Sequence, residues 1–344
     1  MRLPQALDTF LPRIEEELRA SMNPPADSPP AFFGMMYYHL GWADPQFRPA
    51  QMKTGKRLRP LFTLLTCQAA GGDPYAALPA AAAVELLHNF SLIHDDIQDQ
   101  SHTRRGQATV WALWGAAQAI NAGDAMFTLA HLALHRLDER GLPGERVAAA
   151  LRVLDLASLA LCHGQHMDLD FESHLDVDAH AYLRMIRGKT AALLGCACQL
   201  GALVASPDRV LAERYRQVGE GLGLAFQIHD DVLGIWGQAE VTGKPVADDI
   251  RRRKKSLPVV YMLSQQGNSS AERLRAIYAQ ETLAEEDVVE VIAILDGGQA
   301  RSFAERLAQQ HLESALTELE AAQPEPEAGE TLRELAHFLT QRAY

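Results

Sequence analysis

The chain has 344 residues, of which 47% are apolar and 7% aromatic, and it carries 32 Lys and Arg against 44 Asp and Glu. A net charge of -12 argues against general attraction to nucleic acid or to an anionic membrane, so any phosphate must be bound by a local cluster of cations. The four cysteines are scattered, unlike those of a zinc site or a disulfide framework, which indicates a reducing cytoplasmic location.

Helical periodicity runs along most of the chain and strand signals are scarce, which predicts an all-α protein. The first predicted helix spans Leu3–Ser21, and a proline-rich loop, Asn23–Pro30, separates it from an aromatic helical segment, Phe32–Leu40. Further helices are predicted at Arg59–Ala70, Ala76–Asp99, Ala116–Arg136, Glu145–Leu169, His180–Val204 and Leu211–Ile235, with others between Pro258 and Leu339. The pattern assigns no role to the aromatic residues Phe32–Trp42.

No long polar linker divides the chain, so we expect a single domain over residues 1–344. It comprises an N-terminal extension (1–50), a motif-bearing segment (51–260) and C-terminal helices (261–344). The acidic residues that follow Pro4 are unlike a secretory or transit peptide. The most apolar stretch, Thr190–Ser206, is short for a bilayer span, and we predict a buried helix and no transmembrane segment.

Two predicted helices end in related acidic strings. Asp95 and Asp99 are four residues apart, one helical turn on one face, where they repel each other unless a cation lies between them. Asp230 and Asp231 end the second string, and each pair follows an apolar run, which favours the mouth of an apolar cavity over a solvated helix end. Magnesium suits such sites, since it binds one or two carboxylates and keeps waters for substrate phosphates.

Compact groups of cations accompany these acids. Gly55–Pro60 reads GKRLRP, and Arg104 and Arg105 follow the first acidic string by a few residues. We expect both groups to face the same diphosphates as the acids. The basic run Arg251–Lys255 lies near Gly243-Lys244 and is interpreted as a flap that closes over phosphates, rather than as a nucleic-acid patch.

These motifs, in this order, closely resemble those of the trans-polyprenyl diphosphate synthases. The resemblance runs from Lys56 to Pro258 and rests on GKRLRP, DDIQD, RRG, GQHMDL, Lys189-Thr190, FQIHDD, Gly243-Lys244 and KKSLP. It implies an isoprenoid synthase-type bundle of antiparallel helices around a deep central cavity, usually as a homodimer. The implied reaction condenses isopentenyl diphosphate head to tail with an allylic diphosphate of five to fifteen carbons.

The resemblance also implies roles for individual residues. About three magnesium ions per active site would be held by Asp95, Asp99 and Asp230, with the neighbouring Asp96 and Asp231 also catalytic. The allylic diphosphate would contact Arg104, Lys189 and Lys244, and isopentenyl diphosphate would contact Lys56, Arg57, His88 and Arg105. Lys254 is assigned to substrate through the flap, and the Lys189-Thr190 carbonyls and Gln227 would stabilise the allylic carbocation. The second motif often ends in a third Asp, whereas this chain has Gly234.

Product length in this family depends on the residues just before the first acidic motif. Here Phe90 precedes a small residue, Ser91, which lies nearly one turn beneath Asp95 and leaves room for a growing chain. This arrangement predicts a C20 product, geranylgeranyl diphosphate, with C15 and C25 or longer products as alternatives. A class I terpene cyclase and a non-catalytic subunit are the competing functions, disfavoured respectively by the isopentenyl diphosphate cluster and by the two acidic pairs.

Overall fold

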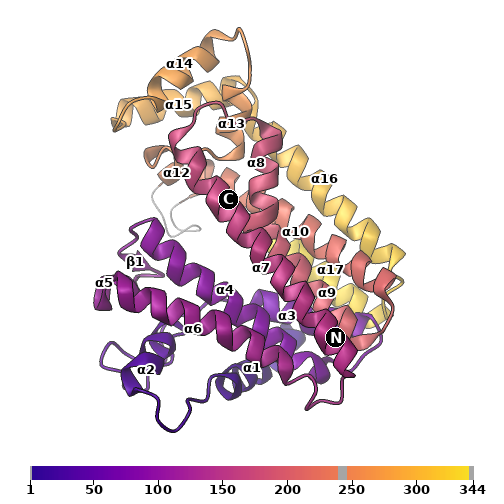
Figure 1. Cartoon of the computed structure of the whole chain (residues 1–344). Helices are drawn as coiled ribbons and strands as arrows, with labels where there is room; N and C mark the ends of the chain where they lie inside the picture. Colours follow the sequence, from indigo (N-terminus) through magenta and orange to yellow (C-terminus); the bar gives the residue numbers. More distant parts are fainter. Residues whose placement is uncertain (1, 239–245, 341–344) are drawn as a thin grey trace. The chain divides into compact units, whose positions relative to one another are not determined.

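The computed structural model describes residues 2–238 and 246–340. Contacts divide the chain, whose helices are labelled in Figure 1, into two compact units. Unit 1 contains Met1–Asp155, Ala197–Ala212 and Pro324–Thr331; unit 2 contains Leu156–Cys196, Glu213–Gln323 and Leu332–Tyr344. Nearly all regular structure in the described residues is helical, as predicted.

Unit 1 is built around one central helix, α4, against which several other helices of the unit pack. α4 packs against α6, α3 and α1, and its interior face is built from small and aliphatic side chains that include Ala80, Ala83 and Leu87. The elements of this unit are α1 (Leu3–Ser21), α2 (Pro30–His39), α3 (Leu58–Ala69), the 3-10 turn η1 (Pro74–Ala77), α4 (Leu78–Gln98), β1 (Thr103–Arg104), β2 (Gln107–Ala108), α5 (Val110–Trp114), α6 (Ala116–His135) and the first part of α7 (Gly144–Ser173).

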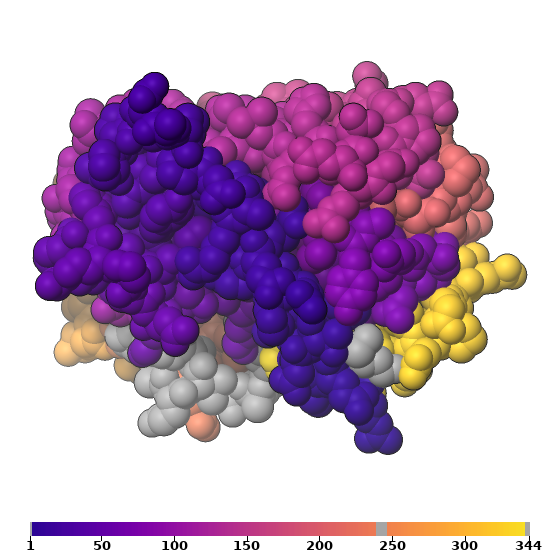
Figure 2. Space-filling view, turned by 90° about the horizontal axis from the view of Figure 1, so that it is seen from below, coloured from indigo at the N-terminus to yellow at the C-terminus, as the bar shows by residue number. Residues whose placement is uncertain are grey.

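The N-terminal helix is fixed to unit 1 by both apolar and charged contacts. Phe10, Ile14 and Leu18 repeat at helical spacing and are buried. On the same helix the buried carboxylate of Glu17 pairs with Arg136 at 2.7 Å and with Arg140 at 2.9 Å. The N-terminal residues, indigo in Figure 2, therefore form part of the surface of this unit while burying one face against it.

The aromatic segment Phe32–Trp42, to which the sequence pattern assigned no role, contacts the small hairpin β1–β2. The Tyr38 hydroxyl donates to the Ala108 carbonyl oxygen at 2.8 Å, and its ring packs edge-on against Trp114 with centroids 5.1 Å apart. Phe47 stacks on the same indole at 5.3 Å. The segment thus anchors the hairpin that follows the first acidic motif.

Unit 2 holds two clusters of buried apolar side chains, one built around Leu274, Val291 and Leu295 and the other around Tyr182, Ile228 and Val260. Its elements are the rest of α7, α8 (Ala179–Ile186), the π-helix η2 (Arg187–Ala191), α9 (Ala192–Ala205), α10 (Arg209–Trp236), α12 (Asp248–Arg251), α13 (Leu257–Leu263), α14 (Ser269–Tyr278), α15 (Glu285–Gly297), α16 (Ala300–Ala321) and α17 (Pro326–Thr340), of which α9, α10 and α17 also have residues in unit 1.

The predicted continuous helix His180–Val204 is interrupted, because η2 inserts a π-turn between α8 and α9. Close packing accompanies this turn: a Cβ on Gly164 would lie 2.1 Å from the Lys189 amide nitrogen, and one on Gly188 would lie 2.6 Å from the Ala160 carbonyl oxygen. Two glycines therefore let α7 and η2 approach backbone to backbone. Single π-turns of this kind are frequent at functional sites.

Three helical segments of the described chain are long and apolar enough to cross a membrane, judged by length and composition: Pro74–Gln98, Gly144–Ser173 and Ala179–Ala205. The most apolar windows of the first and third are 78% and 72% buried within the protein, and that of the second is 39% buried. Burial of the third agrees with the prediction of a buried helix at Thr190–Ser206.

Candidate active site

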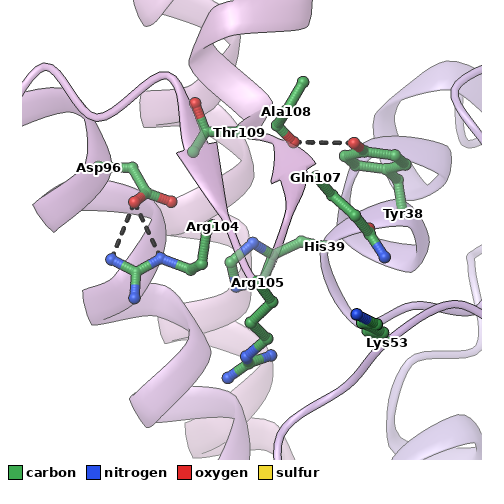
Figure 3. Close-up of a pocket in the computed structure, with 9 residues that line it drawn as sticks. All are labelled: Tyr38, His39, Lys53, Asp96, Arg104, Arg105, Gln107, Ala108 and Thr109. Atoms are coloured by element: carbon green, nitrogen blue, oxygen red, sulfur yellow. Dashed lines mark hydrogen bonds and ion pairs between the residues drawn. The ribbon is translucent and has the colours of Figure 1, made fainter. Parts of the chain in front are cut away.

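The first acidic motif forms the last turn of α4 and presents its three acids differently. Asp95 is partly exposed and Asp99 is exposed, whereas Asp96 is only 2% exposed. The Arg104 guanidinium donates from Nε to Asp96 Oδ1 at 2.9 Å and pairs with the same oxygen through Nη2 at 2.8 Å (Figure 3). Burial raises the pKa of Asp96 to about 6, although Arg104 opposes the shift. Asp96 therefore orients an arginine, and the other two acids remain at the surface.

The arginines after this motif lie on a tight hairpin. Arg105 and Gly106 both have positive φ angles, 55° and 78°, the combination that a two-residue hairpin turn requires. The turn directs Arg104 toward Asp96, as Figure 3 shows, and brings Arg105 close to Gly55 of the GKRLRP loop. A Cβ on Gly55 would lie 2.9 Å from Arg105 Nη2, so the glycine of that loop leaves room for the guanidinium.

The two arginines of GKRLRP have different surroundings. Arg57 is 7% exposed, pairs with the buried Glu85 at 2.6 Å and donates to the Leu40 carbonyl oxygen at 3.3 Å. Arg59 approaches His88 instead, with its Nη1 3.2 Å from His88 Nε2. Arg57 is thus occupied by a structural ion pair, and Arg59 is the arginine beside the predicted histidine. Lys56 is exposed.

A pocket of positive charge lies between this hairpin and the end of α2. Its lining consists of Tyr38, His39, Lys53, Asp96, Arg104, Arg105, Gln107, Ala108 and Thr109 (Figure 3). Burial, together with Arg104 and Arg105, lowers the pKa of His39 to about 3. Burial and the same arginines, together with Arg59, lower the pKa of His88 well below its usual value. Both histidines are therefore neutral at pH 7, and the arginines supply the positive charge beside them.

The residues before the first motif contact α6. The Phe90 ring packs against Phe127 with centroids 5.2 Å apart and against His94 at 4.8 Å. Ser91 is 8% exposed, and its hydroxyl donates to the His88 carbonyl oxygen at 2.8 Å. Ser91 thus presents a small side chain whose polar atom is already satisfied.

In unit 2 the π-turn orients Lys189 and Thr190. The Lys189 ammonium pairs with Asp168 at 2.5 Å, and the Thr190 hydroxyl donates to Gln227 Oε1 at 2.8 Å. Asp168 belongs to the GQHMDL motif, and the sequence analysis assigned it no separate role. A π-turn leaves backbone carbonyls outside the regular helical pattern, where they can face a substrate.

The second acidic motif ends a long buried face of α10. Asp231 is fully buried; it accepts from the Tyr182 hydroxyl, from the Leu257 amide at 3.0 Å and from Gln227 Nε2 at 3.3 Å. Burial raises its pKa, opposed by Lys254 and Tyr182. Asp230 is partly exposed. As in the first motif, the second acid of the pair is turned inward and the first remains accessible.

Lys254 lies against two carboxylates of this unit. Its ammonium is 3.5 Å from Asp231 Oδ1 and 3.7 Å from Asp249 Oδ2. Burial by itself would lower the pKa of Lys254, but Asp231 and Asp249 outweigh burial and raise it, so the side chain is a permanent cation. Gly243 and Lys244 lie outside the described residues.

These residues fit magnesium as the resemblance implies. In the described part of the chain, no three or more His, Cys, Asp or Glu residues group closely enough to enclose an ion by themselves. Magnesium does not require such a group, since it takes one or two carboxylates and completes its shell with water and substrate phosphate. The exposed Asp99 and the partly exposed Asp95 and Asp230 are donors of this kind.

Comparison with known proteins places the chain in a family. The model of the polyprenyl synthetase family matches residues 46–295, which include parts of both units. The chain belongs to this family. It is 42% identical over 310 residues to (2E,6E)-farnesyl diphosphate synthase of Mycobacterium tuberculosis, covering 89% of this chain and 84% of the relative. It is 41% identical over 294 residues to geranylgeranyl diphosphate synthase of the same organism, covering 85% and 83%.

Solved structures of similar fold agree with this family assignment. Polyprenyl synthetase from Streptomyces coelicolor A3(2) superposes with a TM-score of 0.89 and 35% identity, covering 98% of this chain and 99% of the other. Geranylgeranyl pyrophosphate synthetase from Pyrococcus horikoshii superposes with a TM-score of 0.85 and 33% identity, covering 99% of each chain. The predicted helical isoprenoid synthase fold is thereby confirmed. The chain is a prenyl diphosphate synthase, a prenyltransferase that joins isoprenoid units head to tail.

Proposed function

We propose that this prenyltransferase makes geranylgeranyl diphosphate, a C20 product, by extending allylic diphosphates with isopentenyl diphosphate. The supporting observation is the pair Phe90 and Ser91. Ser91 is small and lies nearly one turn beneath Asp95, and the neighbouring bulky ring of Phe90 packs against Phe127. The identities of 42% and 41% to farnesyl and geranylgeranyl synthases differ too little to decide the length.

Unit 1 supplies the isopentenyl diphosphate contacts in this proposal: Lys56, Arg59, His88 and Arg105. Arg59 replaces the Arg57 of the sequence prediction, because Arg57 already pairs with Glu85 and cannot turn to a ligand without leaving that buried carboxylate uncompensated. Neutral His88 offers one ring nitrogen as a donor to phosphate. Arg104, oriented by Asp96, contacts the allylic diphosphate.

Unit 2 supplies Lys189 and Lys254 to the allylic diphosphate, and Thr190 and Gln227 to the carbocation. Lys244 keeps its predicted role in binding that diphosphate. Asp95, Asp99 and Asp230 would hold magnesium, which when bound would supply positive charge to the departing pyrophosphate. Arg104 and Lys189 share that task as the allylic C–O bond breaks.

The carbon–carbon bond then forms from the double bond of isopentenyl diphosphate to the allylic cation. A carbonyl oxygen of the π-turn and the Gln227 amide oxygen face the cation as dipoles, which stabilise positive charge without forming a stable covalent adduct. A proton leaves the isopentenyl unit to the released pyrophosphate. The product is again an allylic diphosphate, longer by one C5 unit.

Product analysis tests the proposal directly. The purified chain is incubated with isopentenyl diphosphate, magnesium and each of the C5, C10 and C15 primers, and chain lengths are measured by mass spectrometry. We expect C20 from all three primers. Ser91→Phe should shift the product to C15, Phe90→Ala should lengthen it, and Ser91→Ala is the matched control that keeps C20. A wild-type product that stops at C15 would assign the chain to the farnesyl synthases instead.

We also propose a homodimer in the cytoplasm. Leu132 on α6 and Leu156 and Leu159 on α7 are large aliphatic side chains that are more than half exposed, at 54%, 55% and 54%. Leu156 and Leu159 lie about one turn apart on α7, and adjacent exposed apolar side chains of this size are typical of surfaces that a partner covers. All four cysteines are free, which fits a reducing compartment. Light scattering of the purified protein should give twice the mass of 37.8 kDa.

A further inference from the structure

Gly234 stands where the second acidic motif often has a third Asp, and the structure shows what fills the space. A Cβ built on Gly234 would lie 2.2 Å from Asp249 Oδ2, 2.6 Å from Asp249 Cγ and 3.2 Å from Asp249 Oδ1. The whole carboxylate of Asp249 thus occupies the volume that a side chain at position 234 would enter. An acid is therefore present at this place, but it comes from α12.

Asp249 is enclosed rather than solvated. Its side chain is 10% exposed, and among the residues that the structure describes the cation paired with it is Lys254, whose ammonium is 3.7 Å from Oδ2. The backbone joins the same two residues, because the Lys254 amide donates to the Asp249 carbonyl oxygen at 2.8 Å. A buried carboxylate needs such compensation, so Asp249 and Lys254 constrain each other.

The other side of Lys254 is fixed by Asp231. This carboxylate is itself held by the Tyr182 hydroxyl and the Leu257 amide, so it is a rigid anchor. The Lys254 ammonium therefore lies between a carboxylate from α10 and one from α12, with its side chain 37% exposed. Two buried anions define where the cation is, and the exposed part is free to meet a substrate anion.

We propose that Asp249 takes the place of the missing third acid of the second motif, and that it acts with Asp231 as a positioning residue that holds Lys254 toward the allylic diphosphate. Gly234 is then a required small residue. The inference rests on the proposed function in one respect, the assignment of Lys254 to that diphosphate. The shared volume of positions 234 and 249 is independent of it.

A swap of the carboxylate between the two positions tests the proposal. Gly234→Asp alone should lower kcat/KM for the allylic diphosphate, because the new side chain pushes Asp249 away from Lys254. Asp249→Ala alone should lower it about tenfold or more through misplacement of the cation. The double variant Gly234→Asp/Asp249→Ala returns one carboxylate to the same place, and it should recover most of the lost activity and thermal stability. Asp248→Asn, at the neighbouring acid that pairs with Arg252, is the matched control without loss.

A double-mutant cycle of Asp249 and Lys254 separates a positioning role of Asp249 from a merely structural one. If Asp249 acts through Lys254, Asp249→Asn should raise KM for the allylic diphosphate in the wild type and have little further effect beside Lys254→Met. A full effect of Asp249→Asn beside Lys254→Met would overturn the proposal. So would a Gly234→Asp variant with wild-type kinetics, a double variant no better than the single ones, or an Asp249→Asn variant that changes only the magnesium requirement.

The same experiments distinguish this inference from the proposed function. A wild-type chain that formed no prenyl product would contradict the function. The recovery of the unfolding temperature in the double variant would still report whether positions 234 and 249 share one volume. Active wild type with no such recovery would contradict the inference alone.

Discussion

The ends of α4 and α10 carry the same chemistry in different surroundings. In both, the first acid is partly exposed and the second is buried against a cation, Arg104 for Asp96 and Lys254 for Asp231. The first motif then continues to an exposed Asp99, whereas the second ends at Gly234, beside Asp249. In each motif, therefore, one acid of the pair is partly exposed and the other orients a cation.

The largest expected effect comes from the first acid of each pair. Asp95→Asn and Asp230→Asn remove a carboxylate available to magnesium, and kcat should fall by about 10³-fold in each, since charge stabilisation of the leaving group is lost. Steady-state kinetics across magnesium concentrations, with thermal unfolding as the fold control, measure this. Near-normal kcat in Asp230→Asn would break the parallel between the motifs.

Replacing the second acid of each pair, Asp96 or Asp231, should lower the free energy of unfolding by different amounts. Asp231→Asn leaves Lys254 facing one carboxylate fewer in a buried network, and it should cost about 3 kcal/mol of unfolding free energy. Asp96→Asn should cost less, because its partner Arg104 reaches solvent with a side chain that is 31% exposed. Urea denaturation of both variants gives the two values. Equal losses would show that the two buried acids have equivalent surroundings.

Lowering the pH should reduce the stability of unit 1, because this unit buries the neutral histidine His39 beside Arg104 and Arg105. The pKa of His39 is lowered to about 3 from the usual 6.5, so the unfolded chain binds one more proton between these values. Protonation of His39 in the unfolded chain therefore costs the fold nothing above pH 6.5. As the pH falls from 6.5 toward 3, it progressively lowers the free energy of unfolding. His39→Gln should therefore reduce the loss of stability between pH 7 and pH 5 by about 1–2 kcal/mol, measured by urea denaturation at both pH values. An unchanged loss would contradict burial of neutral His39.

The smallest expected effect concerns the glycine beside the first cation cluster. Gly55→Ala brings a methyl group to 2.9 Å from Arg105 Nη2, the far end of a long side chain that can move by a few tenths of an ångström. We expect KM for isopentenyl diphosphate to rise about two- to fivefold with kcat little changed. Gly234→Ala should be more damaging, because the short Asp249 side chain can yield only by leaving Lys254. Equal effects of the two substitutions would weaken that contrast.

The sequence predicted the local features of the chain well. The helix Leu3–Ser21 is confirmed at both ends, and the other long helices between Arg59 and Ile235 are confirmed apart from the π-turn at Arg187–Ala191. That turn depends on close packing at Gly164 and Gly188, which no periodicity reports. The ordered motifs predicted the family, because each motif fixes residue types at a spacing that chemistry requires.

What the sequence determined by itself was the all-helical fold class, the family and the motifs that contain the candidate acids and cations, since these follow from helical periodicity and from motif spacing. Tertiary structure alone decided which member of each cluster is available. Arg57 is occupied by Glu85 while Arg59 stands beside His88, and Asp249 fills the space left at Gly234. The reason is physical: burial and pairing depend on residues distant in the chain, and spacing along the chain does not encode them.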